Sequence, residues 1–213
     1  MSIFRFNFDK TLILLISIFH ALSGSSNHQH PVNTTHRQLR RNDDGHFYYF
    51  AFGSNLLKER INVNIPSAQF VSIGRLQNYK LVFYGNSSNW HGGLASIERR
   101  RGAKVWGCIW KVPNSFARAL DRQELLYRRL DVDIKQPLSH HRRKVRCRTY
   151  QYKNPEVGKQ RPSPHYKHVI VTGAQEHHLP DSYIERLKKI KTNAYRGRVK
   201  VRLELLRRFR QRG

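Results

Sequence analysis

The stretch Phe47-Tyr48-Tyr49-Phe50-Ala51-Phe52-Gly53-Ser54-Asn55 decides how the rest of the chain is interpreted. Its first six residues are aromatic or small and apolar, which predicts a strand that is buried on both faces. Gly53 allows a positive φ and a close approach of a ligand to the backbone. Ser54 and Asn55 add polar side chains beside backbone N–H groups, so the strand end can form a pocket for an anion. On these residues alone, an ordinary strand followed by a turn is the favoured interpretation.

The chain is strongly basic. Its 213 residues include 40 Lys and Arg against 14 Asp and Glu, which gives a formal net charge of +26. Such a surface attracts nucleic acid, sulfated glycans or anionic lipid heads. Nonspecific binding of acidic polymers is favoured over a dedicated nucleic-acid role, because no recognition module accompanies the basic blocks. The two cysteines, Cys108 and Cys147, form no disulfide framework; they either make one bridge or stay buried as free thiols.

The N-terminal region predicts export. Residues 1–24 resemble a secretory signal. Arg5 and Lys10 supply a positive start, the apolar core at 12–19 that follows is too short to span a bilayer, and Ala21 and Ser23 have the spacing of a cleavage site. We therefore expect a secreted protein; the alternatives are an N-terminal anchor or a cytoplasmic protein. No transmembrane segment is expected after the signal. Residues 25–45 are polar and predict a disordered linker, and Asn33 and Asn86 lie in glycosylation sequons.

Residues 46–200 predict one folded domain of the α+β class, in which strands outnumber helices and the helices come late. A turn at 99–102 is expected to join a strand pair, and 140–143 a second pair, where His140 and His141 lack partners at metal-ligand spacing. Residues 201–213 are a basic tail that the pattern predicts to be solvated rather than core; a short amphipathic helix from Arg198 is the alternative. The expected strands are 68–75, 79–84, 94–98, 104–112, 127–134 and 144–152, and the expected helices begin near 56, 114, 163 and 180.

Short motifs follow one another in an informative order. They are Tyr49–Leu57, Pro66–Ala68, Gly74–Leu76, Leu81–Phe83, Trp90–Ile97, Val105–Gly107 with Trp110, Leu120–Glu124, Pro162–Tyr166, Gly173-Ala174 and Leu179-Pro180. In this order they resemble the animal-type γ-glutamylcyclotransferase family, over roughly residues 47–200. The resemblance implies a mixed α+β fold around a small β-barrel, with the pocket at the end of the first strand. It also implies conversion of a γ-glutamyl dipeptide to 5-oxoproline and a free amino acid, a homodimer, and neither a metal nor an organic cofactor.

The resemblance also implies the site residues. Glu124, in Leu-Asp-Arg-Gln-Glu, matches the general base that shuttles a proton to the leaving amine, and Tyr166 matches a tyrosine whose hydroxyl reaches the substrate. Without the resemblance, Glu124 would be interpreted as a surface residue at a helix end and Tyr166 as a core aromatic residue. Trp90 to Gly93 more naturally shape the pocket wall than perform chemistry. The matched substrate-binding residues are Tyr49, Phe50, Ala51, Phe52, Gly53, Ser54 and Tyr166.

The chemistry is consistent with these residues. The α-amine of the glutamyl group attacks its own γ-carbonyl, and a tethered nucleophile has a large advantage once its chain is held folded. The amine needs a base, and a carboxylate with apolar neighbours has its pKa raised toward the useful range. Two positions depart from the family pattern: Phe52 stands where the family has Tyr, and Leu125 where it has Gly. They keep open an alternative, a secreted cationic binding protein on the same fold with a weakened or inactive site.

Overall fold

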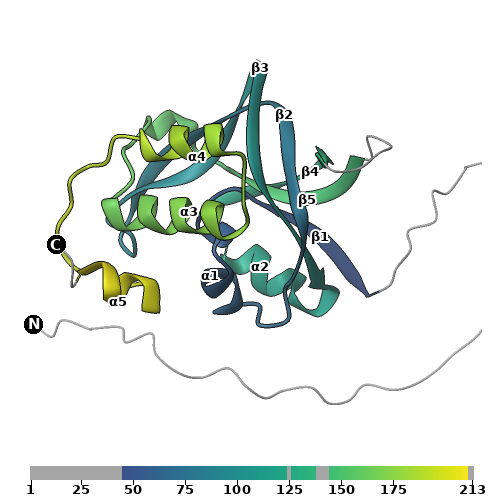
Figure 1. The fold of residues 1–213 in the computed structure, drawn as a ribbon, viewed down its shortest axis with the longest axis horizontal. Coiled ribbons are helices and arrows are strands. Elements are labelled where there is room, and N and C mark those ends of the chain that lie inside the picture. Colours follow the sequence, from purple (N-terminus) through teal and green to yellow (C-terminus); the bar gives the residue numbers. More distant parts are fainter. Residues whose placement is uncertain (1–44, 124–125, 138–143, 211–213) are drawn as a thin grey trace, which may run out of the picture. The chain divides into compact units, whose positions relative to one another are not determined.

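Five strands close into a barrel in the order β1-β3-β2-β4-β5 (Figure 1). The computed structural model describes residues 45–123, 126–137 and 144–210, all within the unit Asn42–Gly213. The α+β class and the barrel are therefore confirmed. The strands are β1 His46–Ala51, β2 Gln69–Ser87, β3 Gly92–Pro113, β4 Tyr127–Lys135 and β5 Lys144–Tyr152.

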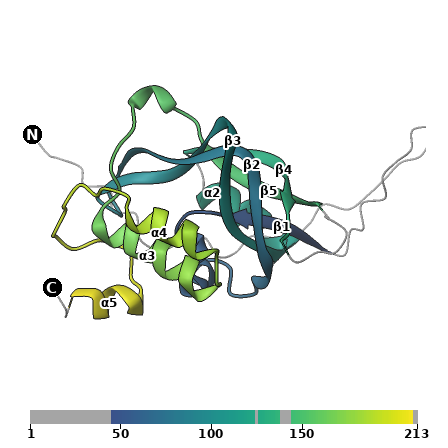
Figure 2. The ribbon, with the colours of Figure 1, turned by 45° about the horizontal axis from the view of Figure 1, so that its top comes forward.

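Short helices follow the first strand, and longer ones follow the barrel. In Figures 1 and 2, α3 and α4 lie side by side, and α3 also contacts η1 and α5. None of the described helices is both long and apolar enough to cross a membrane. The helices are η1 Ser54–Leu56, α1 Lys58–Asn62, η2 Asn114–Phe116, α2 Ala117–Gln123, η3 Pro155–Val157, α3 Pro164–Glu176, α4 Asp181–Lys188 and α5 Glu204–Arg210.

The predicted strand pairs around β2 and β3 are wrong in one respect. Residues 94–98 and 104–112 do not pair with each other; both belong to β3 and pair with β2, which likewise joins 68–75 to 79–84. The turn signal at 99–102 corresponds to an irregularity opposite Asn78, where Gly102 has φ +78° and donates its N–H to Asn78 Oδ1 at 3.0 Å. Glycine supplies the positive φ that lets the strand bulge and then continue.

The opening strand is buried in its second half. Tyr49, Phe50, Ala51 and Phe52 are all buried, whereas Tyr48 is 38% exposed, so burial on both faces holds only from Tyr49 onward. β1 pairs antiparallel with β3 and parallel with β5, and the pairing with β5 has Tyr49 opposite Arg148. Thr149 Oγ1 on β5 donates to Phe50 O at 2.9 Å. The end of β1 is thereby fixed from both sides of the barrel.

Both cysteines are buried free thiols, which decides between the two alternatives left by the sequence. Burial, with Glu176 nearby, raises the pKa of the Cys108 thiol, and burial with Asp133 nearby raises that of Cys147 to about 12. Both side chains therefore stay protonated at neutral pH and act as small apolar core residues.

The start of α3 agrees with the sequence prediction, whereas α5 does not. Ser163 caps α3 as predicted, because its Oγ accepts the Tyr166 N–H at 3.2 Å. The prediction that the tail beyond residue 200 is solvated rather than core is wrong for Leu203 and Leu206, which are 3% and 2% exposed. The Phe209 ring of α5 stacks on His168 at 4.3 Å. The amphipathic pattern of α5 outweighs its basic composition.

Several predictions concern residues that the structure does not describe. The signal, the linker up to residue 44, the Asn33 sequon and the turn at 140–143 lie outside the described residues, as do Glu124 and Leu125. Asn86 of the second sequon lies in β2 and is exposed.

Candidate active site

A cavity of about 270 Å³ opens where β1 ends. It gathers five of the seven predicted substrate-binding residues, from two distant parts of the chain: Tyr49, Phe52, Gly53, Ser54 and Tyr166. Phe50 and Ala51 do not line the cavity; they are 0% and 1% exposed and belong to the core. The roles of all seven in substrate binding stay predictions. The remaining lining comes from Asn55, Arg60, Ser87, Asn89, Trp90, Leu94, Ala95, Leu126, Tyr127 and Tyr150.

The segment that follows β1 is held by side chains from the barrel. Trp110 Nε1 donates to Asn55 O at 3.1 Å, and Asn55 Nδ2 donates to the Tyr49 hydroxyl at 3.2 Å. Leu56 N donates to Gly53 O at 3.0 Å and closes the first turn of η1. Because the segment is fixed from two strands, its backbone is presented to the cavity in one conformation.

Gly53 serves by its small size rather than by a positive φ, since its φ is −108°. A Cβ at this position would lie 3.1 Å from Ala95 Cβ and 3.3 Å from the Tyr166 hydroxyl. Within the described residues, the backbone N–H groups of Gly53 and Ser54 donate no hydrogen bond to the protein. Two adjacent amide donors at a cavity wall can hold a carboxylate or a developing oxyanion.

The opposite wall is organised around the backbone of Ala95 on β3. Ala95 N donates to the Tyr166 hydroxyl at 3.2 Å, and the Tyr127 hydroxyl donates to Ala95 O at 3.0 Å. The Trp90 ring lies 4.8 Å from the Tyr166 ring and lines the cavity, as the sequence predicts for this loop. These contacts fix the Tyr166 hydroxyl beside Gly53.

Tyr150 contributes a second polar edge. Its hydroxyl donates to Asp121 Oδ1 at 2.6 Å, and its ring meets the Tyr49 ring edge-on at 5.9 Å. Burial and the Asp121 carboxylate raise the pKa of the Tyr150 phenol, so it remains a neutral hydrogen-bonding group.

Sequence reasoning missed Tyr127, Tyr150 and Arg60 as cavity residues. Tyr127 begins β4 and Tyr150 lies near the end of β5, and these strands pair antiparallel, with Tyr150 opposite Arg129. The start of one antiparallel strand lies beside the end of the next, so two tyrosines in those places were the available signal. Arg60 carried no such signal, because it sits in a helix too short to show periodicity.

No group of three or more His, Cys, Asp or Glu side chains gathers to hold a metal ion in the part of the chain that the structure describes. Apart from Arg60, the described side chains that line the cavity are neutral, and several of them are aromatic. Such a wall can enclose a small polar molecule and hold it by hydrogen bonds.

The small barrel and the cavity at the end of its first strand define a broad class of folds. Residues 104–187 match the AIG2-like family. YkqA from Bacillus subtilis shares the fold with a TM-score of 0.55 at 21% identity, over 70% of this chain and 56% of that one.

Closer relatives then define the family. The chain is 44% identical to γ-glutamylcyclotransferase from Bos taurus over 172 residues, which is 78% of this chain and 90% of the bovine protein. It is 43% identical to the Homo sapiens γ-glutamylcyclotransferase over 168 residues, 76% of this chain and 88% of that protein. A solved structure titled γ-glutamyl cyclotransferase matches with a TM-score of 0.71 at 38% identity, over 79% of this chain and 99% of that one. The chain therefore belongs to the γ-glutamylcyclotransferase family of enzymes.

Proposed function

We propose that this enzyme cyclises a γ-glutamyl dipeptide to 5-oxoproline and releases the second amino acid. The observation that carries the proposal is the meeting of Gly53 and Ser54 with Tyr166, more than 100 residues later, around one cavity. The relatives named γ-glutamylcyclotransferase support the same reaction. A carboxylate and a carbonyl oxygen are the groups that paired backbone amides and a tyrosine hydroxyl bind well.

In this reaction the α-amine of the glutamyl group forms a bond to its own γ-carbonyl carbon, and the bond from that carbon to the leaving nitrogen breaks. We assign Glu124 the removal of the amine proton and its delivery to the leaving amine. In the sequence, only Leu125 separates Glu124 from Leu126, which lines the cavity. The Gly53 and Ser54 amides hold the glutamyl α-carboxylate or the charge on the attacked carbonyl.

The aromatic walls serve the same chemistry. Tyr49, Phe52, Trp90, Tyr127 and Tyr166 line the cavity, so we expect their rings to lie beside the reacting groups. Water would compete with the amine for the carbonyl, so aromatic side chains beside the carbonyl favour ring closure over hydrolysis. Holding the substrate folded brings the tethered amine to the carbonyl and supplies much of the rate advantage.

The test is the release of 5-oxoproline from a γ-glutamyl dipeptide by the wild type and by Glu124→Gln. We expect product from the wild type and almost none from the variant. Glu185→Gln is the matched control, since Glu185 is an exposed α4 residue paired with Lys188 at 2.8 Å, and its rate should equal that of the wild type. Equal rates for Glu124→Gln and wild type, or no product from either, would contradict the proposal.

A second candidate function is binding of acidic polymers by the basic surface. It is favoured by the formal charge of +26 and by Phe52, which lines the cavity where the family has a tyrosine. Affinity for heparin or nucleic acid that falls steeply with salt would support it. Affinity that is insensitive to moderate salt would count against it.

We further propose that residues 1–24 direct secretion and that the mature enzyme is a homodimer. The first rests on the signal-like sequence and the second on the family resemblance. Sequencing the N-terminus of protein from the culture medium tests the first, and light scattering of the purified protein tests the second. An intact Met1 on cell-retained protein, or a monomer mass, would contradict them.

A further inference from the structure

Arg60 is the charged residue of the cavity. Among the lining residues that the structure describes, it alone carries a full charge, and the others are aromatic, apolar, amide or hydroxyl side chains and glycine. We propose that Arg60 binds the carboxylate of the amino acid that leaves, and so selects γ-glutamyl peptides with a free carboxyl end. This inference rests on the proposed function, because it concerns the second half of the same substrate.

The substrate needs two anion sites. A γ-glutamyl dipeptide carries the α-carboxylate of its glutamyl residue and the carboxylate of the second amino acid, on opposite sides of the bond that breaks. The Gly53 and Ser54 amides, beside the Tyr166 hydroxyl, account for one site at the reacting end. A guanidinium presents two parallel N–H donors that fit a carboxylate. Neutral side chains cannot bind a carboxylate with equal strength. The Gly53 and Ser54 amides alone would bind only one end of the substrate. Arg60 therefore supplies the site for the carboxylate at the other end.

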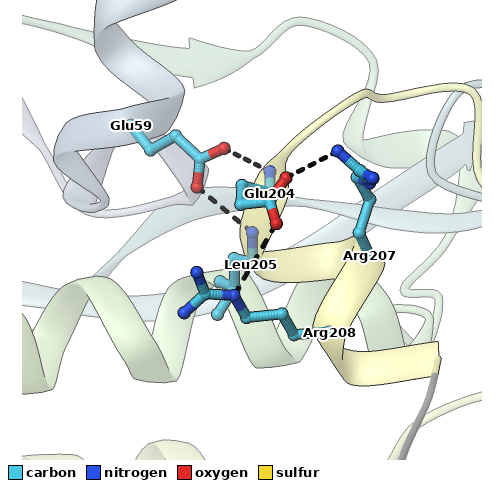
Figure 3. Close-up of polar contacts among 5 residues, drawn as sticks. All are labelled: Glu59, Glu204, Leu205, Arg207 and Arg208. Atoms are coloured by element: carbon cyan, nitrogen blue, oxygen red, sulfur yellow. Dashed lines mark hydrogen bonds and ion pairs between the residues drawn. The ribbon is translucent and has the colours of Figure 1, made fainter.

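The backbone of α1 fixes where the Arg60 side chain starts. Ile61 is 1% exposed, and Lys58 N donates to Glu176 Oε2 at the end of α3, at 3.0 Å. The Glu59 carboxylate faces the first turn of α5 and accepts the Glu204 N–H and, at 3.3 Å, the Leu205 N–H (Figure 3). A helix of five residues is not stable alone. Contacts with α3 and α5 supply that stability and hold Arg60 at the cavity.

Ion pairs within α5 orient the Glu204 side chain at the start of that helix. Glu204 pairs with Arg207 at 3.0 Å and with Arg208 at 3.7 Å, so its side chain is directed along α5 (Figure 3). The first backbone N–H groups of the helix therefore remain available to the Glu59 carboxylate. A charged residue that is held by a rigid backbone loses less conformational entropy when it binds its ligand.

The experiment compares γ-glutamylglycine with γ-glutamylglycinamide, which differ only in the terminal carboxylate. For the wild type we expect kcat/KM to be about 10- to 100-fold higher with the acid, the range of a charge-assisted hydrogen-bond pair. Arg60→Gln should lower kcat/KM for the acid by this factor and leave kcat/KM for the amide unchanged. Arg60→Lys should give an intermediate kcat/KM for the acid. Lys58→Gln removes the same charge from the exposed side of α1 and should behave as the wild type.

Binding gives the same comparison without turnover. Calorimetry on Glu124→Gln protein should show tighter binding of the acid than of the amide, and addition of Arg60→Gln should abolish the difference. Equal losses on both ligands, or a preference that survives Arg60→Gln in folded protein, would overturn the role of Arg60. If the wild type releases no 5-oxoproline but the binding difference follows Arg60, the proposed reaction fails and the carboxylate site stands. If neither ligand binds, both fail.

Discussion

Phe52 is the cavity residue where a single hydroxyl separates this chain from the pattern of its family. Its ring is 6% exposed and lines the cavity, so a hydroxyl on that ring would be added at or near the substrate. A neutral hydrogen bond contributes about 1 kcal/mol. We expect Phe52→Tyr to lower KM for a γ-glutamyl dipeptide about fivefold.

The control for Phe52→Tyr is Phe116→Tyr, which makes the same chemical change in η2, outside the cavity. It should leave KM unchanged. If KM of Phe52→Tyr also stays at the wild-type value while the protein remains folded, the position does not contact the substrate.

Tyr166 combines a structural and a proposed catalytic contact. Its hydroxyl accepts the Ala95 N–H at 3.2 Å within a buried wall. Tyr166→Phe should cost about 1–3 kcal/mol of unfolding free energy, because a buried donor loses its acceptor, and it should also lower kcat/KM. Tyr183→Phe removes another buried hydroxyl, one that lies away from the cavity, and should leave the activity unchanged. Denaturant unfolding and the 5-oxoproline assay separate the two effects; full activity of Tyr166→Phe would contradict the proposed role.

Sequence reasoning identified the cavity residues that lie in contiguous motifs and missed those that the barrel brings in. Gly53, Ser54 and Tyr166 stand in motifs that a linear comparison can match. Tyr150 reaches the cavity through strand register and a hydrogen bond to Asp121, neither of which local sequence specifies. Phe50 was assigned to the site because it lies in the motif, although strand geometry turns its side chain into the core.

Gly173 on α3 sets how closely that helix approaches the segment below the cavity. A Cβ there would lie 2.4 Å from Leu57 N and 2.6 Å from the carbonyl carbon of Leu56, and both are backbone atoms that cannot rotate away. Alanine would gain about 1 kcal/mol in helix propensity, but overpacking costs about 1–3 kcal/mol. We expect Gly173→Ala to lower the free energy of unfolding and, by displacing η1, the activity.

Gln175→Ala is the control for Gly173→Ala, because Gln175 is exposed on the same helix. Its unfolding free energy should stay within about 0.5 kcal/mol of the wild type. A Gly173→Ala protein as stable and active as the control would show that α3 can shift without cost.

His177 at the end of α3 links stability to pH. Its ring stacks on Phe70 at 4.4 Å and meets Trp110 edge-on at 5.2 Å. Burial lowers the pKa of this imidazole; Glu176 partly opposes the shift, whereas Lys58 and His178 add to it. The unfolded chain, with a histidine pKa of about 6.5, then binds more protons than the folded one below that pH. Acidification through this range should therefore lower the melting temperature.

The measurement is the melting temperature of the wild type and of His177→Gln at several pH values on both sides of about 6.5. The variant should melt lower at neutral pH, because the stacking is lost, but depend less on pH. Some dependence should remain, since burial and His165 also lower the pKa of His168. A variant with the same pH slope as the wild type would exclude His177 as a source.

Long-range strand pairing explains what local patterns could not predict. The sequence indicated a turn at 99–102, and Gly102 does adopt a positive φ. Whether such a glycine ends a strand or makes a bulge depends on the partner, here Asn78 on β2, whose side chain accepts the Gly102 N–H. The start of α3 was predicted correctly because its cap, Ser163, is a local signal.

Charge is the property of the whole molecule that the fold does not neutralise. A formal charge of +26 leaves far more cations than the acidic residues can pair with. Mutual repulsion of these charges destabilises the compact state. Salt shortens the range of repulsion, since the Debye length falls from about 30 Å at 0.01 M to about 8 Å at 0.15 M. We therefore expect the melting temperature to rise with sodium chloride over this range.

Two salts distinguish screening from a bound anion. At equal ionic strength, sodium sulfate and sodium chloride should raise the melting temperature to a similar extent if screening of the whole surface is the cause. A much larger rise with sulfate at low concentration would indicate that an anion binds the folded state at a particular site. A melting temperature independent of both salts would show that the basic residues are far enough apart for their repulsion to be negligible.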